Sequence, residues 1–183
     1  MDFTEWPRVV SVVNALSTKL LAEVHRDGKI WVQEYAKGQP QYSVKEAGET
    51  TEHGTTVTFS PDMTIFQVSE YNFDTLSARL RELAYLNKRI KLSLTDERRT
   101  NDDGTFVTEN YYSEEGLVEF VKYLDGTRSP IIEDVIYMEG EKQGMPVEIA
   151  VVYDASNTEN LHSYVTNINT HEGGTHLAGF RRG

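Results

Sequence analysis

Residues 167–180 read N-I-N-T-H-E-G-G-T-H-L-A-G-F and change character at their centre. The preceding residues, 161–168, are rich in β-branched and aromatic side chains that favour a strand. Gly173 and Gly174 interrupt this pattern, because glycine has no Cβ and lets another backbone approach closely. Thr175 can then cap the start of a helix. The stretch therefore predicts a strand, a glycine turn and the beginning of a helix.

Two chemical interpretations of this stretch fail on spacing. His171, Glu172 and His176 resemble the zinc-protease pattern H-E-x-x-H, which needs its histidines one helical turn apart. Here they are five residues apart, with two glycines between them. The phosphate-binding pattern G-x-x-x-x-G-K-[ST] also fails, because Phe180 follows Gly179 where a lysine is required. Physical reasoning alone favours a glycine bend that holds a helix against a sheet.

Composition limits the classes of protein that fit. The 183 residues suffice for one large or two small domains. A formal net charge of −11 argues against a main DNA-binding surface, because phosphate neutralisation needs clustered Lys and Arg. With no cysteine, disulfides and thiolate metal sites are excluded. No apolar run approaches the roughly 20 residues that span a bilayer, and no signal peptide is recognisable. These features predict a cytoplasmic, soluble protein of mixed α and β structure.

Hydrophobic periodicity predicts the other elements. Helices are expected at residues 10–20, 73–87 and 115–124. Strands are expected at residues 20–26, 29–35, 40–44, 55–60, 90–95, 105–112, 131–139 and 146–153. Residues 47–53 are polar and are expected to form a loop, and Asp27-Gly28 predicts a tight hairpin turn.

Four stretches in chain order carry a family resemblance. They are S-V-V-N-A-L-S at 11–17, G-T-T-V-T-F at 54–59, L-R-E-L-A-Y-L-N at 80–87, and the stretch at 167–180. Each is similar to a motif of the gyrase B family, which consists of ATP-hydrolysing type II DNA topoisomerases. Together the matches extend from Val10 to Gly183, whereas residues 1–9 resemble nothing in that family.

The resemblance implies an α+β fold in two parts. Residues 10–115 would form the C-terminal half of a Bergerat-type ATPase sandwich, the type shared with heat-shock chaperones and histidine kinases. Residues 116–183 would form part of a ribosomal-protein-like βαβ transducer domain. Residues 1–9 would be an unmatched N-terminal segment.

The resemblance also implies which residues contact ATP: Val10, Ser11, Gly54, Thr55 and Val57. Thr55 would help to read the adenine amino group, since a hydroxyl both donates and accepts hydrogen bonds. Val10 and Val57 would form apolar walls, Gly54 would let the backbone turn close to the nucleotide, and Ser11 would contact a phosphate. Taken alone, the valines fit ordinary core positions equally well, and Thr55 fits a solvent-facing strand position.

Three arginines receive roles through the same resemblance. Arg26 resembles the arginine at the pocket rim that aminocoumarin inhibitors contact, although a surface charge on a hairpin explains it as well. Arg181 and Arg182 would open a helix that faces a DNA cavity.

The resemblance places no catalytic residue and no metal ligand within this chain. The family's catalytic Glu, its Mg²⁺-holding Asn and its D-x-G-x-G motif would all precede residue 1. In the full-length protein the cofactors would be ATP and Mg²⁺. The partners would be DNA, the A subunit of gyrase and a second copy of the B subunit, with no membrane. That protein would couple ATP hydrolysis to DNA strand passage and negative supercoiling. This chain alone is expected to lack ATPase activity, to be marginally stable and to expose an apolar face.

Three alternatives remain open at this point. The paralogous ATPase subunit of topoisomerase IV belongs to the same class. A truncated, stand-alone interaction module would explain the unmatched residues 1–9. A metalloprotease is the third alternative, and the spacing of His171 and His176 disfavours it.

Overall fold

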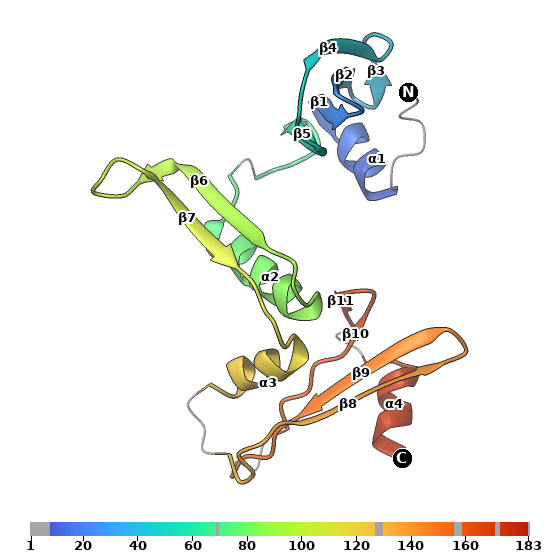
Figure 1. The fold of residues 1–183 in the computed structure, drawn as a ribbon, viewed down its shortest axis with the longest axis vertical. Helices are drawn as coiled ribbons and strands as arrows, with labels where there is room; N and C mark the ends of the chain where they lie inside the picture. Colours follow the sequence, from blue (N-terminus) through green and yellow to red (C-terminus); the bar gives the residue numbers. More distant parts are fainter. Residues whose placement is uncertain (1–7, 69, 127–129, 156–158, 171–172, 183) are drawn as a thin grey trace. The chain divides into compact units, whose positions relative to one another are not determined.

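The computed structural model describes the chain except residues 1–7, 69, 127–129, 156–158, 171–172 and 183 (Figure 1). The chain divides into two compact units, Met1–Tyr71 and Asn72–Gly183. Both contain helices and antiparallel strands, so the predicted α+β fold is confirmed. None of the described helices is long and apolar enough to cross a membrane.

Unit 1 is an antiparallel sheet with one helix beside it (Figure 1). Its elements are α1 (Arg8–Ala15), β1 (Ser17–Arg26), β2 (Lys29–Ala36), β3 (Gln39–Pro40), β4 (Lys45–Glu49) and β5 (Gly54–Pro61). The strand order is β3-β2-β1-β5, and β4 also pairs with β2. Asp27 and Gly28 take φ values of 56° and 78°, which confirms the predicted turn between β1 and β2.

Fully buried side chains of unit 1 lie on one face of β1. Leu20 and Ala22 are both 0% exposed, and they alternate on the same side of the strand. The hydroxyl of Ser17 donates to the Val13 carbonyl at 2.6 Å, which ties the end of α1 to the first residue of β1. The core of unit 1 is thus built where α1 meets the central strand.

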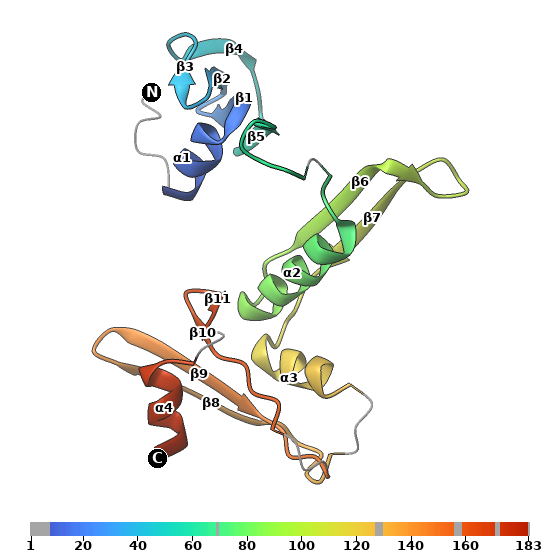
Figure 2. The same ribbon diagram turned by 180° about the vertical axis from the view of Figure 1, so that it is seen from behind.

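Unit 2 consists of helices and three two-stranded antiparallel hairpins. Its elements are α2 (Phe73–Leu86), β6 (Leu92–Thr100), β7 (Phe106–Tyr111), α3 (Leu117–Asp125), β8 (Ile136–Lys142), β9 (Met145–Val151), β10 (Tyr164–Val165), β11 (Ile168–Asn169) and α4 (Thr175–Arg182). Helix α2 packs against the β6–β7 hairpin (Figure 2). It also meets α3 through Tyr85 and Phe120, whose rings stack with centroids 5.1 Å apart. Phe120 is 6% exposed, so these rings form part of the core of unit 2.

Several expectations from sequence were wrong in detail. The strand predicted at 40–44 is not continuous, because β3 ends at Pro40 and β4 begins at Lys45, and the strand predicted at 131–139 begins only at Ile136. The helix predicted at 10–20 ends at Ala15, because Leu20 pairs with both neighbours of β1. The loop predicted at 47–53 begins with strand β4, since pairing with β2 outweighs its polar composition. The strand predicted at 161–168 is instead the start of a tight hairpin, with Thr166 and Asn167 at positive φ.

The turn and helix predicted from the opening stretch are confirmed. Gly173 has φ +75° and its N–H donates to the Thr170 carbonyl at 2.7 Å, as expected for a glycine turn. Helix α4 begins at Thr175. Gly179 lies inside α4, whereas the phosphate-binding pattern requires a loop there.

Candidate functional site

The predicted ATP-contacting residues of unit 1 lie mainly on β5, at one end of the sheet. Gly54, Thr55 and Val57 oppose His25, Val24 and Ala22 of β1, respectively. Residues that face each other across an antiparallel pair share a side of the sheet. Thr55 and Val57 therefore lie on the same face as the buried side chains of β1.

On that face, the side chains of β1 are buried and those of β5 are exposed to solvent. Leu20 and Ala22 are 0% exposed, whereas Phe59 and Val57, directly opposite them, are 42% and 37% exposed. Thr55 continues this row and is also exposed. Within the part of the chain that the structure describes, the Thr55 hydroxyl makes no hydrogen bond. The row is thus an apolar surface with one free hydroxyl at its end.

Sequence reasoning gave Phe59 no ligand-contacting role. The sequence already indicated its position, because Phe59 stands two residues after Val57 in the same strand and so faces the same side of the sheet. The structure shows that it extends the open apolar row by one residue.

Val10 and Ser11 lie in α1, which packs against β1, β2 and β5. Val10 is half-buried and Ser11 is exposed. No hydrogen bond or ion pair among the described residues joins either side chain to β5. The structure therefore brings the helix that carries them to the sheet without a direct polar link to Thr55.

Arg26 is the last residue of β1 and is exposed. It follows His25, the partner of Gly54, so Arg26 and Gly54 lie at the same end of the sheet. Its Nε is 3.4 Å from the Asp27 carboxylate, and 59% of the Arg26 side chain is exposed. An ion pair this open is weak, which leaves the guanidinium available to a ligand at the rim.

On the opposite face, His25 is held by two neighbours. Its Nδ1 lies 3.0 Å from the Thr50 hydroxyl and its Nε2 lies 2.9 Å from Glu23 Oε1. With both ring nitrogens occupied, His25 fixes the end of β1 rather than offering a ligand contact.

The two other predicted residues, Arg181 and Arg182, were expected to open a helix, but they form the end of α4, which begins at Thr175. Both are exposed on α4, and Arg181 Nη2 is 2.6 Å from Glu159 Oε2. A shallow hollow of about 310 Å³ lies along this helix, lined by Gly173, Gly174, Leu177, Ala178, Arg181 and Arg182. It is a basic surface on an acidic chain.

Two residues of the stretch whose spacing disfavours a zinc-protease motif, His171 and Glu172, lie outside the described residues. The third member, His176, has its Nε2 3.4 Å from the Thr170 hydroxyl. Among the described residues, no group of three or more His, Cys, Asp or Glu side chains is placed to hold a metal ion.

Comparisons with known proteins agree with one another. The family model described as DNA gyrase B matches residues 116–183. The DNA gyrase B subunit of Eisenibacter elegans is 53% identical over 173 residues, which cover 94% of this chain and 36% of that protein. The corresponding B subunit of Cytophaga hutchinsonii is 54% identical with the same coverage. The chain therefore spans about a third of the length of these relatives.

A solved structure extends the likeness to the fold. The crystal structure of the 43K ATPase domain of Thermus thermophilus gyrase B, in complex with an aminocoumarin, superimposes with a TM-score of 0.83. Sequence identity is 30%, and the match covers 94% of this chain and 46% of that one. The α+β fold of this chain is thus the fold of part of that ATPase domain.

Proposed function

Because the chain belongs to the DNA gyrase B family, we propose that it serves as part of an ATP-dependent type II DNA topoisomerase. In the whole protein, ATP binding and hydrolysis would be coupled to DNA strand passage and negative supercoiling. The chain spans 36% of the length of its relatives, so these activities are proposed for the whole protein. The gyrase relatives support this assignment over the paralogous protein of topoisomerase IV.

The open row on β5 is the observation that carries the proposal. A purine binds against flat apolar surface and is oriented by a few polar groups. Val57 and Phe59 supply exposed apolar surface, and the adjacent Thr55 supplies a hydroxyl that makes no hydrogen bond among the described residues. We assign this row to the adenine, with Val10 as a further wall, Gly54 as the point of close backbone approach and Ser11 as a phosphate contact.

Hydrolysis is not assigned to this chain. The reaction requires a base that orients water and a metal that spreads phosphate charge. The sequence contains no D-x-G-x-G motif, and the described residues offer no group of three metal-ligating side chains. The described residues therefore do not fit a resident Mg²⁺ ion.

Roles for the arginines follow from their positions. Arg26 stands at the end of the sheet where Gly54 begins β5, which supports a place at the pocket rim. The Thermus thermophilus structure contains an aminocoumarin, and we propose Arg26 as a contact for such an inhibitor in this protein. Arg181 and Arg182, exposed on α4, are proposed to face DNA.

The proposed partners are those of a gyrase. We propose that the whole protein binds DNA, the A subunit of gyrase and a second copy of the B subunit, and that it is located in the cytoplasm. The gyrase B matches support this assembly.

One observation favours a stand-alone interaction module as a second candidate. Among the described strands, β5 pairs only with β1, so its other edge is open to a partner strand. A module of this kind would bind an extended segment along β5 and would not respond to nucleotides.

The test is a titration of isotope-labelled chain with a non-hydrolysable ATP analogue, followed by backbone amide NMR. One wall of a site offers little binding energy, so we expect a dissociation constant of about 1 mM or weaker. Shifts should concentrate at Gly54–Val57 and in α1, and Thr55→Val should weaken them. Thr56→Val is the matched control, since Thr56 faces the opposite side of the sheet.

Two results would overturn the proposal. Shifts that avoid β5, or equal effects of the two threonine variants, would remove the adenine assignment. Phosphate release from ATP by the purified chain would contradict the statement that it does not hydrolyse ATP alone.

A further inference from the structure

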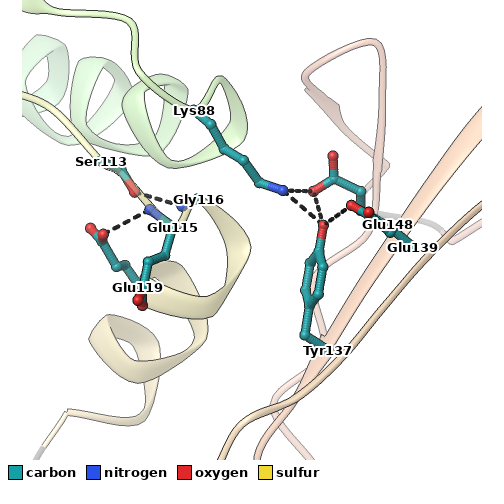
Figure 3. Close-up of polar contacts among 8 residues, drawn as sticks. All are labelled: Lys88, Ser113, Glu115, Gly116, Glu119, Tyr137, Glu139 and Glu148. Atoms are coloured by element: carbon teal, nitrogen blue, oxygen red, sulfur yellow. Dashed lines mark hydrogen bonds and ion pairs between the residues drawn. The ribbon is translucent and has the colours of Figure 1, made fainter.

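Lys88 follows the C-terminal cap of α2 and reaches the β8–β9 hairpin (Figure 3). Its Nζ donates to the Tyr137 hydroxyl at 2.7 Å and lies 3.1 Å from Glu148 Oε2. The ammonium is also 4.8 Å from the centre of the Tyr137 ring. The Lys88 side chain thus connects the end of α2 with the β8–β9 hairpin, which lies in the segment 116–183 that the gyrase B family model matches.

The hairpin carries two carboxylates that oppose each other. Glu139 and Glu148 are direct partners across β8 and β9, and like charges in such positions destabilise a strand pair. The Tyr137 hydroxyl is 2.8 Å from Glu139 and 3.1 Å from Glu148, and it can donate its single proton to one of them. Lys88 brings positive charge to this pair. The Lys88 contact therefore offsets the repulsion within the hairpin and also attaches the hairpin to the end of α2.

Gly116 leaves room for the lysine stem. It is the N-cap of α3, with φ +64°, and its N–H donates to the Ser113 hydroxyl at 2.8 Å (Figure 3). A Cβ at Gly116 would lie 2.6 Å from Lys88 Cγ and 2.8 Å from Cε. Because these atoms lie along the stem, any larger residue at this position would displace the side chain from its path.

A second contact joins α2 to the β10–β11 hairpin. The Tyr164 hydroxyl donates to Glu82 Oε1 at 2.7 Å, and Arg79 Nη2 donates to the Asn167 carbonyl at 2.7 Å. Of the α2 residues in this contact, Arg79 is 42% exposed, but the Glu82 side chain that accepts from Tyr164 is only 20% exposed, whereas the two ends of the Lys88 ion pair are 33% and 41% exposed. Solvent weakens exposed ion pairs, so the Lys88 contact is the easier of the two to open.

We propose that Lys88 is a releasable latch between α2 and the β8–β9 hairpin, and that the β10–β11 contact with α2 stays closed when the latch opens. With the latch closed, α2 and the β8–β9 hairpin move together. When the latch opens, the hairpin loses the charge that offsets its carboxylate pair and moves more freely relative to α2. This device is independent of the proposed ATP site.

Hydrogen exchange of the full chain tests the latch. Lys88→Met keeps the stem and removes the charge. An exposed ion pair contributes little, so we expect roughly two- to fivefold faster exchange of the amides at 136–151. Lys91→Met is the matched control, because it makes the same chemical change at a lysine near a tyrosine ring. The Lys91 ammonium lies 5.9 Å from the centre of the Tyr112 ring, and neither Lys91 nor Tyr112 belongs to the segment 116–183. Unchanged exchange in Lys88→Met, or an equal effect of the control, would overturn the proposal.

A second variant separates the two consequences of opening the latch, which are the unbalanced carboxylate pair in the hairpin and the lost link to α2. Glu139→Gln in the Lys88→Met background removes the carboxylate repulsion, so it should restore slow exchange in the hairpin without restoring the link to α2. The chain has no cysteine, so Ala78→Cys and Glu141→Cys can carry the only spin labels. Their distance distribution should be narrow in the parent chain and broad in both Lys88→Met backgrounds. A narrow distribution throughout would overturn the latch.

Two glycines test the path of the lysine. Gly116 and Gly126 have nearly the same φ, +64° and +65°, but a Cβ at Gly126 would meet nothing within 4 Å. Gly116→Ala should therefore broaden the label distances as Lys88→Met does, while Gly126→Ala carries the same backbone strain and should not. Equal broadening by both would show that strain alone matters, which would overturn the role of Gly116.

Discussion

Asp62 ties the end of β5 back to the rest of unit 1. Its side chain is 4% exposed, and Lys37 Nζ lies 2.7 Å from its carboxylate. The backbone N–H and the hydroxyl of Thr64 donate to the same carboxylate at 3.0 and 2.7 Å. The hydrogen bond from Lys37, followed by those from Thr64, lowers the pKa of Asp62 from 3.8 to about 2.

This shift predicts acid sensitivity. A carboxylate whose pKa is lower in the folded state contributes stability that is present above pH 3.8 and is lost as the pH falls through about 2. We therefore expect the urea midpoint of unit 1 to fall over this window, and Asp62→Asn to remove that part of the fall. The measurement is urea unfolding followed by tryptophan fluorescence, since Trp31 lies in β2. Asp27→Asn, which removes a carboxylate of the same unit that is 83% exposed, is the matched control.

At the same scale, residue types explain which side chains of β5 share a face. A β-branched row with a hydroxyl at its end was visible in G-T-T-V-T-F, and strand alternation placed Thr55, Val57 and Phe59 on one side. Sequence could not say which side of the strand was buried. The pairing of Val57 with the fully buried Ala22 decides this, and that pairing joins separate strands.

Helix α2 shows how local signals determine an element. Asn72 Oδ1 accepts from the Thr75 N–H at 2.9 Å, which caps the first turn. At the other end, the N–H of Asn87 donates to the Leu83 carbonyl at 3.0 Å. Both ends lie within one residue of the predicted range, 73–87, because capping depends only on nearby residues.

The cap makes a prediction about stability. Asn72→Ala leaves an N–H of the first turn without its side-chain partner and should cost about 1 kcal/mol of unfolding free energy. Asn72→Ser keeps an oxygen that can cap and should cost much less. Urea unfolding followed by circular dichroism measures both, and a similar loss in the two variants would contradict the capping role.

Short strands were the elements that sequence reasoning missed. Strand β4 has an exposed, polar sequence and forms only because β2 offers it a pairing edge. The hairpin of β10 and β11 turns at Thr166 and Asn167, and Asn167 is held there by Arg79 and by the Asn87 side chain at 2.8 Å. In both cases a distant partner fixes the backbone, and no local pattern carries that information.

For the whole molecule, charge and exposed apolar surface act in opposite directions. The chain carries a formal net charge of −11, which keeps copies apart. It also exposes large apolar side chains on β5 and on the β8–β9 hairpin, namely Val57, Phe59, Ile136, Met138, Met145 and Val147. Such surfaces promote association when repulsion is screened.

Salt should therefore increase self-association. The Debye screening length shortens from about 30 Å at 0.01 M to about 10 Å at 0.1 M ionic strength, so the electrostatic repulsion between chains falls across that range. Sedimentation velocity should detect more associated chain at the higher ionic strength. Phe59→Lys should reduce this association, while Thr58→Lys, with the same change in charge on the opposite face, should not. Association that ignores salt, or equal effects of the two variants, would contradict this account.

The sequence by itself determined the elements whose signals are local. The Asp27-Gly28 turn, the helix at 73–87, the glycine turn before α4 and the motifs that resemble those of gyrase B were all present in short stretches. Only the tertiary structure decided which face of β5 is open and that Lys88 meets Tyr137. Lys88 and Tyr137 are 49 residues apart, and Glu82 and Tyr164 are 82 apart. Periodicity and turn preferences act over a few residues, whereas contacts at such separations exist only after the elements have packed.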